Sequence, residues 1–184
     1  MKYILLLITL TLLITACSTT QTAEQAPESF PDQKLADNPE KSTVDWRTIT
    51  VTDVNTNTQY KVNDFKGKPI IIESFAVWCP KCTAQQKEVK ELHELNKEVI
   101  SISLDTDPNE DESFVKEHAQ KNGFDWRYSV APREMTISLI DEFGTGVVNA
   151  PSTPVILICP DGTTNYLSRG SKKAEDLQEA IKAC

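Results

Sequence analysis

The chain has 184 residues, which is enough for one domain with additional segments. Its composition, 39% hydrophobic and 25% charged, is ordinary for a globular protein. The formal net charge of −8 argues against a nucleic-acid partner, because binding to phosphates requires a basic surface.

The first 16 residues have the pattern of an export signal. Lys2 supplies a positive start, and residues 4–16 form an apolar segment that is too short for a membrane span. The segment ends in Ile-Thr-Ala-Cys, which resembles a bacterial lipoprotein signal with lipid attached to Cys17. The alternatives are an uncleaved anchor or ordinary secretory cleavage. All three place the protein outside the cytoplasmic membrane, so we expect it in the cell envelope, with the membrane reached through a lipid anchor.

Residues 17–44 form the next segment and are rich in Ser, Thr, Gln, Glu and Pro. Its few large apolar side chains cannot bury enough surface to offset the entropy of ordering. We therefore predict a disordered tether over 17–44 and a globular domain over 45–184.

The globular part begins with β-branched alternation over 46–54, a turn signal, and a return over 58–62, which together predict an N-terminal β-hairpin extension. The apolar patterns that follow predict strands at 70–76, 99–104, 126–130, 154–159 and 164–168, and helices at 80–96, 111–122, 133–143 and 171–183. Strands that alternate with helices indicate an α/β fold, with a central mixed sheet and helices on both faces.

Two cysteines three residues apart, Cys79 and Cys82, stand at the start of the first predicted helix. Pro80 suits the first helical turn. The unpaired N–H groups at a helix start stabilise a thiolate on the first sulfur, and Lys81 adds positive charge nearby. We therefore expect Cys79 to attack disulfides, and Cys82, one turn further and more deeply buried, to resolve the mixed disulfide.

A zinc half-site or a structural disulfide is the alternative role for this pair. Zinc needs two more ligands, but Cys159 and Cys184 do not form a second close pair. His93 and His118 lie beside charged residues on predicted helices, so we expect them at the surface. We predict neither a metal nor a cofactor.

The segment Trp78-Cys79-Pro80-Lys81-Cys82, between a strand and a helix, resembles the active site of the thioredoxin superfamily. Ser152-Thr153-Pro154 stands where that family carries a cis-proline beside the disulfide, and the turn at 160–162 before the closing helix also matches. The resemblance covers 45–184 and implies a thioredoxin-like fold. It assigns Thr153 and Pro154 to the site, and we expect Trp78 to shape a docking surface for partners.

The tethered layout resembles the TlpA/ResA-like branch, whose members are membrane-anchored thiol-disulfide oxidoreductases of the cell envelope. That branch usually carries a glutamate three residues after the second cysteine, where this chain has Gln85. Glu73 falls instead where thioredoxins carry a buried acid beneath the disulfide. Burial raises the pKa of a carboxyl group, so our hypothesis is that Glu73 exchanges a proton with Cys82. Pairing of Glu73 with a lysine such as Lys68 is the alternative.

The two remaining cysteines and one acidic run lie outside the redox pair. The order of the last strands and the last helix brings Cys184 near Cys159, which predicts a structural disulfide in an oxidising compartment; a buried free thiol with a frayed terminus is the alternative. Residues 105–112 are acidic but lack the spacing of a calcium loop, so we expect a solvated loop and helix start.

The sequence thus predicts an enzyme, a monomeric thiol-disulfide oxidoreductase that exchanges disulfides with protein substrates and draws electrons from a membrane partner. We expect a reductant that acts in cytochrome or oxidase assembly. The alternative is a copper-binding assembly factor that resembles SCO-type proteins, although their cysteines are spaced by three residues and residues 149–154 contain no histidine. A peroxidase is disfavoured because Ala76 and Val77 stand where a threonine is expected.

Overall fold

The computed structural model of the protein describes residues 43–167 and 169–184. The predicted signal over 1–16, the lipidation site Cys17 and all but the last two residues of the tether lie outside this part of the chain. Within the described residues, no helix has the length and apolar character needed to cross a membrane.

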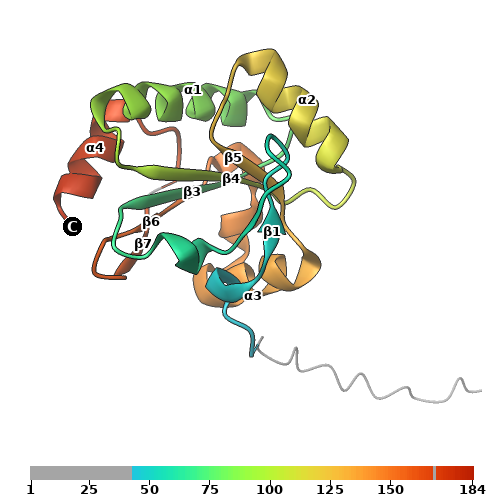
Figure 1. Cartoon of the computed structure of the whole chain (residues 1–184), viewed down its shortest axis with the longest axis horizontal. Helices are drawn as coiled ribbons and strands as arrows, with labels where there is room; N and C mark the ends of the chain where they lie inside the picture. The colour runs from blue at the N-terminus through green and yellow to red at the C-terminus, as the bar shows by residue number, and fades with distance from the viewer. Residues whose placement is uncertain (1–42, 168) are drawn as a thin grey trace, which may run out of the picture. The chain divides into compact units, whose positions relative to one another are not determined.

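A five-stranded sheet forms the centre of the domain, with strand order β5-β4-β3-β6-β7 (Figure 1). The central strand β3 pairs in parallel with β4 and antiparallel with β6, so the sheet is mixed, as predicted. The strands are β3 (Ile70–Phe75), β4 (Ile100–Asp105), β5 (Arg127–Val130), β6 (Val155–Ile158) and β7 (Thr164–Tyr166).

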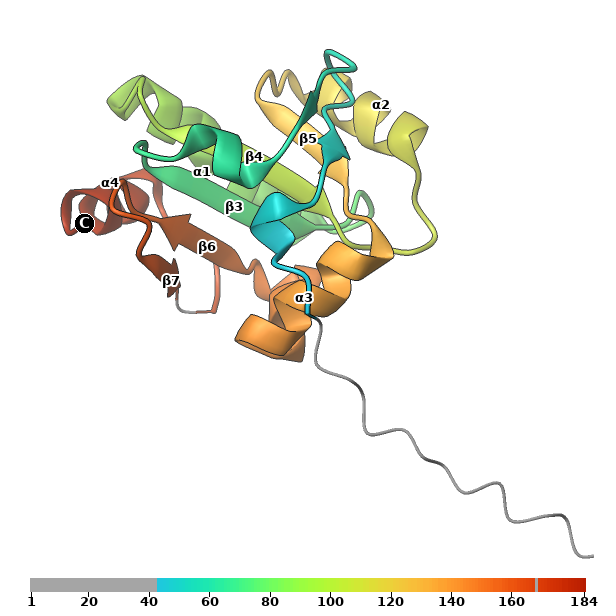
Figure 2. The ribbon, with the colours of Figure 1, turned by 60° about the horizontal axis from the view of Figure 1, so that its bottom comes forward.

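Helices cover both faces of this sheet (Figures 1 and 2). The α-helices in the described part of the chain are α1 (Pro80–Leu95), α2 (Glu112–Asn122), α3 (Arg133–Phe143) and α4 (Ala174–Lys182). Side chains of α1, α2 and α4 share one buried cluster with the disulfide, whereas α3 packs in a second cluster on the opposite face.

The side chains of β3 divide between these two clusters because successive residues of a strand point to opposite faces. Ile71 and Phe75 pack with α1, and Ile70 and Ile72 pack on the side of α3. Glu73 follows the period of Ile71 and Phe75. Its carboxyl group therefore faces the helical layer that carries the two active-site cysteines.

The N-terminal hairpin is present as a small separate sheet of β1 (Val51–Thr52) and β2 (Gln59–Tyr60), paired antiparallel. The hairpin extension is therefore confirmed, but its strands are shorter than the pattern predicts.

The predicted strand over 46–54 is wrong in its first half, where Trp46–Thr48 forms a 3₁₀ helix. The Asp45 side chain accepts the Arg47 N–H at 3.0 Å and so begins this turn. Trp46 is fully buried, and its indole N–H donates to Glu142 at 2.8 Å. The need to bury this indole and satisfy its donor has overridden the local β pattern.

The C-terminal helix also begins later than the pattern predicts, at Ala174 instead of residue 171. It carries the chain back to β6, where Cys184 and Cys159 are joined in a disulfide with their Cα atoms 5.4 Å apart. The bond fixes the last residue of the chain to the end of the central sheet.

Replacing both Cys159 and Cys184 by alanine should lower the free energy of unfolding by about 3 kcal/mol, because the bond closes a loop across 25 residues and restricts the unfolded chain. Urea unfolding followed by circular dichroism measures this difference. Each single variant should lose a similar amount. Wild-type stability in the double variant would show that the bond contributes nothing.

Candidate active site

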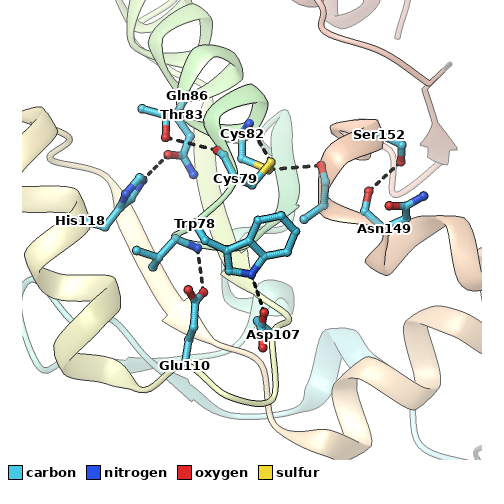
Figure 3. Close-up of a disulfide and its surroundings, with 12 residues drawn as sticks. Trp78, Cys79, Cys82, Thr83, Gln86, Asp107, Glu110, His118, Asn149 and Ser152 are labelled. Carbon is cyan, nitrogen blue, oxygen red and sulfur yellow. Dashed lines mark hydrogen bonds between the residues drawn. A yellow bond between two sulfur atoms is a disulfide. The ribbon is translucent and has the colours of Figure 1, made fainter.

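The two cysteines lie at the start of α1 and are joined in a disulfide, with Cα atoms 5.3 Å apart (Figure 3). Cys79 is the N-cap of the helix, and Pro80 occupies the first turn. The backbone N–H of Cys82 donates to Cys79 Sγ at 3.2 Å. The Cys79 sulfur therefore faces an unpaired helical donor and the positive end of the helix dipole, which both favour a negative charge on it.

Exposure does not distinguish the two cysteines, contrary to the expectation that Cys82 lies deeper. Cys79 is 1% exposed and Cys82 is 2% exposed. A loop that includes the 3₁₀ turn η4 (Ala150–Ser152) lies against the disulfide, and its Ala150 carbonyl oxygen lies 3.2 Å from Cys82 Sγ. Once the disulfide is reduced, the Cys82 thiol can donate to this oxygen. The prediction that Cys79 is the attacking sulfur therefore rests on its position at the N-cap of α1, not on its exposure.

Trp78 is the exposed aromatic side chain of the motif, with 59% of its surface accessible. Its indole N–H donates to Asp107 Oδ2 at 2.6 Å, which holds the ring beside the disulfide (Figure 3). A hollow of about 290 Å³ extends from Trp78 and Pro108 on one side to Asn149 and Pro151 on the other. This surface has the place and apolar character expected for docking a protein chain.

The acidic run over 105–112 is not the fully solvated loop that its composition predicts. Asp105 is completely buried, and Glu110 Oε2 accepts the N–H of Val77 at 2.7 Å, directly before the active-site motif. Together with the bond from Asp107 to Trp78, this contact fixes the backbone and the side chain that precede Cys79.

The carboxyl groups of Asp105 and Glu110 interact with each other. Burial and the neighbouring Glu110 carboxyl raise the pKa of Asp105 to about 7. Asp105 Oδ1 accepts the Asp107 N–H at 2.9 Å, whereas Oδ2 faces no donor within the described chain. Burial and this neighbouring negative charge both favour the protonated form of Asp105.

Glu73 is 2% exposed on the side of the sheet that faces α1. Ser103 Oγ donates to Glu73 Oε1 at 2.6 Å and accepts from the Trp126 indole at 2.8 Å. Because an indole N–H can only donate, the hydroxyl hydrogen must point to Glu73. Burial raises the pKa of Glu73 to about 7, although the hydrogen bond from Ser103 opposes the shift.

The basic group that acts on Glu73 is Lys172, not Lys68. Lys172 is 7% exposed, and its charge lowers the pKa of Glu73, whereas Lys68 lies at the surface. The Gln86 side chain also lowers this pKa, but its Nε2 lies outside hydrogen-bonding geometry with any described atom. Ser103 is therefore the group that holds the Glu73 carboxyl in place.

The histidines are more buried than predicted. His118 is 7% exposed, stacks on Phe75, and shares a hydrogen bond of 2.7 Å with Gln86 Oε1. His93 is half-buried and bonded to Ser101 at 2.8 Å. Burial lowers the pKa of both histidines. Helical periodicity turns both rings toward the sheet, which the charged neighbours in the sequence conceal.

The segment before β6 places Thr153 and Pro154 close behind η4, but without the cis peptide bond that the resemblance implies, since the described residues contain none. Thr153 instead has a left-handed backbone with φ 46°. The Thr153 N–H donates to the Ala150 carbonyl at 2.8 Å, and the Ser74 N–H donates to the Pro154 carbonyl at 3.4 Å. The segment is thus attached both to the loop over the disulfide and to β3.

The structure brings Cys79, Cys82 and Trp78 together at the start of α1, with Lys81 exposed on the first turn. Sequence reasoning missed four residues that hold this region: Asp107, Glu110, Gln85 and Lys172. Gln85 could have been recognised, because it stands where the TlpA/ResA-like branch usually carries a glutamate. No local sequence pattern distinguishes Lys172. No group of three or more His, Cys, Asp or Glu side chains in residues 43–167 and 169–184 is placed to bind a metal ion.

Comparison with known proteins fits this geometry. The family model described as Redoxin matches residues 25–181. The chain belongs to the Redoxin family, within the thioredoxin superfamily. It is 29% identical over 143 residues to the thiol-disulfide oxidoreductase ResA of Bacillus thuringiensis subsp. konkukian, covering 73% of each chain. It is 27% identical to the thiol:disulfide interchange protein DsbE of Vibrio cholerae, covering 66% of this chain and 61% of that one.

Solved structures show the same fold at lower identity. A secreted disulfide oxidoreductase of Mycobacterium tuberculosis, homologous to E. coli DsbE, superposes with a TM-score of 0.57 at 16% identity, over 76% of this Redoxin chain and 98% of its own. BsSco, a member of the Sco family of cytochrome c oxidase assembly proteins, superposes with a TM-score of 0.60 at 19% identity. The match covers 73% of this chain and 90% of BsSco. The comparisons confirm the predicted fold and the predicted enzyme class, a thiol-disulfide oxidoreductase.

The raised pKa of Glu73 predicts how stability depends on pH. A folded-state pKa of about 7, against 4.5 for the free side chain, gives stability that is complete below pH 4.5 and is lost as pH rises through 7. Between pH 5 and 8 the wild type should therefore lose roughly 2–3 kcal/mol more than Glu73→Gln. Urea unfolding of both proteins at several pH values measures this.

The two histidines are present in both proteins, so their own pH effects cancel in that comparison. Parallel pH curves for the wild type and Glu73→Gln would contradict the assignment of a neutral, buried Glu73 below pH 7.

Proposed function

We propose that this Redoxin protein reduces disulfides of protein substrates outside the cytoplasmic membrane, by exchange through Cys79 and Cys82. The observation that carries the proposal is the N-cap geometry, in which the Cys79 sulfur accepts the Cys82 N–H at 3.2 Å. A thiolate stabilised at a helix start is the nucleophile that disulfide exchange requires.

The reaction begins from the reduced enzyme. The Cys79 thiolate attacks one sulfur of the substrate disulfide, that bond breaks, and a substrate thiolate leaves while a mixed disulfide forms. Cys82 then loses its proton and attacks the Cys79 sulfur, which releases the second substrate thiolate. Two electrons have passed to the substrate, and the enzyme is left as the Cys79–Cys82 disulfide that the structure contains.

We assign the proton of Cys82 to Glu73, which lies on the α1 side of the sheet. A pKa of about 7 suits a group that must take and return a proton near neutral pH. The Ser103 hydroxyl bonds to one carboxyl oxygen in either protonation state, so the other oxygen can carry the proton.

The names of the relatives ResA and DsbE, an oxidoreductase and an interchange protein, support the proposed exchange reaction. A structural relative is described as secreted, which supports the envelope setting. The predicted lipoprotein signal agrees with this setting. A reductant there needs electrons from a membrane partner, and we place the protein as a monomer in cytochrome or oxidase assembly. The hollow beside Trp78 is our choice for the substrate-docking surface.

The direction of transfer is tested by the reduction potential of the Cys79–Cys82 couple, measured by equilibration with dithiothreitol. A value near or below about −250 mV is expected for a reductant, close to that of thioredoxin. A value of about −120 to −180 mV would instead mark an oxidase or isomerase.

The roles of the two cysteines are tested by trapping. A Cys82→Ala variant should accumulate mixed disulfides with substrate through Cys79, because the resolving thiol is missing, whereas Cys79→Ala should trap none. Non-reducing electrophoresis with mass spectrometry measures both. Trapping by Cys79→Ala alone would reverse the assignment, and copper retained by the wild type after dialysis would favour the SCO-like alternative.

A further inference from the structure

The segment before α4 holds the loop that covers the disulfide. Residues 171–173, which the sequence pattern assigns to a helix, precede the helix instead. The Gly170 N–H donates to the Ser152 carbonyl at 3.0 Å, and the Lys172 ammonium donates to the Thr153 carbonyl at 2.6 Å. Two consecutive carbonyl groups at the end of η4, those of Ser152 and Thr153, are therefore held by one short stretch of chain.

Gln85 fixes the main chain of Lys172 from the opposite side. Gln85 Oε1 accepts the Lys172 N–H at 2.7 Å, and Gln85 Nε2 donates to the Lys172 carbonyl at 3.1 Å. Gln85 is 1% exposed, so both polar ends of its amide are buried and satisfied. A glutamate carboxylate could not donate to that carbonyl, which gives a physical reason for glutamine here.

These contacts close a ring that begins and ends on α1. Gln85 lies three residues after Cys82 on the helix and holds Lys172. Lys172 holds Thr153, whose N–H donates to the Ala150 carbonyl at 2.8 Å. That carbonyl oxygen lies 3.2 Å from Cys82 Sγ. Moving any member would shift the loop against the disulfide.

The ammonium group of Lys172 is buried where it donates to the Thr153 carbonyl group. Lys172 is the buried member among the lysines and arginines of the described chain. Burial lowers its pKa to about 8, while the facing Glu73 carboxyl on β3 opposes the shift. The adjacent Lys173 differs, since its side chain is 71% exposed and pairs with Glu88 at 2.7 Å. A buried charge is costly unless it is paired or used.

We propose that Lys172 is a positioning residue for disulfide exchange, which holds the η4 loop against the disulfide and supplies positive charge behind Cys82 and Glu73, with Gln85 fixing its main chain. The inference rests on the proposed exchange reaction. It predicts two effects of removing the ammonium group: a displaced loop and a less stable thiolate in the reduced enzyme.

The test compares Lys172→Met with Lys172→Arg, which keeps the charge, and with Lys173→Met as the matched surface control. In the reduced full chain, the rate of Cys79 alkylation by iodoacetamide is followed against pH, a readout that needs no substrate. Lys172→Met should shift the midpoint of this pH dependence, which reports the pKa of Cys79, upward by about one pH unit. It should also slow insulin reduction at least tenfold. Lys172→Arg should recover most of both, and Lys173→Met should match the wild type.

A wild-type midpoint and rate in folded Lys172→Met would overturn the proposal, as would equal changes in Lys173→Met. If Lys172→Met does not fold, Gln85→Glu replaces it. This variant should displace Lys172 and slow insulin reduction several-fold, and a wild-type rate would again overturn the proposal. Failure of the wild type itself to reduce insulin would count against the proposed function only, because the alkylation midpoints still report on Lys172.

Discussion

The hydrogen bond from the Cys82 N–H to the Cys79 sulfur is the interaction on which the site depends. A helix start always leaves backbone donors without partners, and here one of them is aimed at a redox-active atom. The rest of the fold keeps that start in place. Strand β3 leads into the start of α1, and the packing of α1 on the sheet sets the direction of the helix. Before the helix, Glu110 accepts the Val77 N–H and Asp107 accepts the Trp78 indole N–H, which fixes these two residues.

The buried polar groups beneath α1 must also be provided with partners. An apolar core would cost less free energy, because every buried polar atom must find a partner. This chain instead places Glu73 between Ser103 and the charge of Lys172, with Trp126 bonded to the same serine. Burial brings the pKa of the Glu73 carboxyl group near neutrality, which suits the proton exchange that we propose for it.

The loop over the disulfide is held in place by contacts with α1 and with the segment before α4. Both cysteines are almost inaccessible, and the docking surface that we propose is the surface around Trp78 and η4. Short-range contacts alone would leave such a loop mobile. Its attachment to α1 through Lys172 and Gln85 couples its position to the helix that carries the chemistry.

The local features of this protein can be predicted from the order of its residues. Cys79, Pro80 and Cys82 reveal a redox pair at a helix start because the signal lies within four residues, and the apolar runs predict all five strands of the sheet and their covering helices. The burial of Glu73 could also be predicted, because the apolar residues on either side of it in the chain place the whole strand inside the domain. These predictions depend on neighbours in the chain.

Contacts between residues far apart in the chain depend on how the layers of the domain pack. Lys172 resembles Lys173 in the sequence, yet one is buried against Thr153 and the other pairs with Glu88 at the surface. Asp105 and His118 likewise look solvated until the sheet and α2 enclose them. Hydrogen bonds across 87 residues, such as that between Gln85 and Lys172, leave no local pattern, because their geometry exists only after the layers have packed.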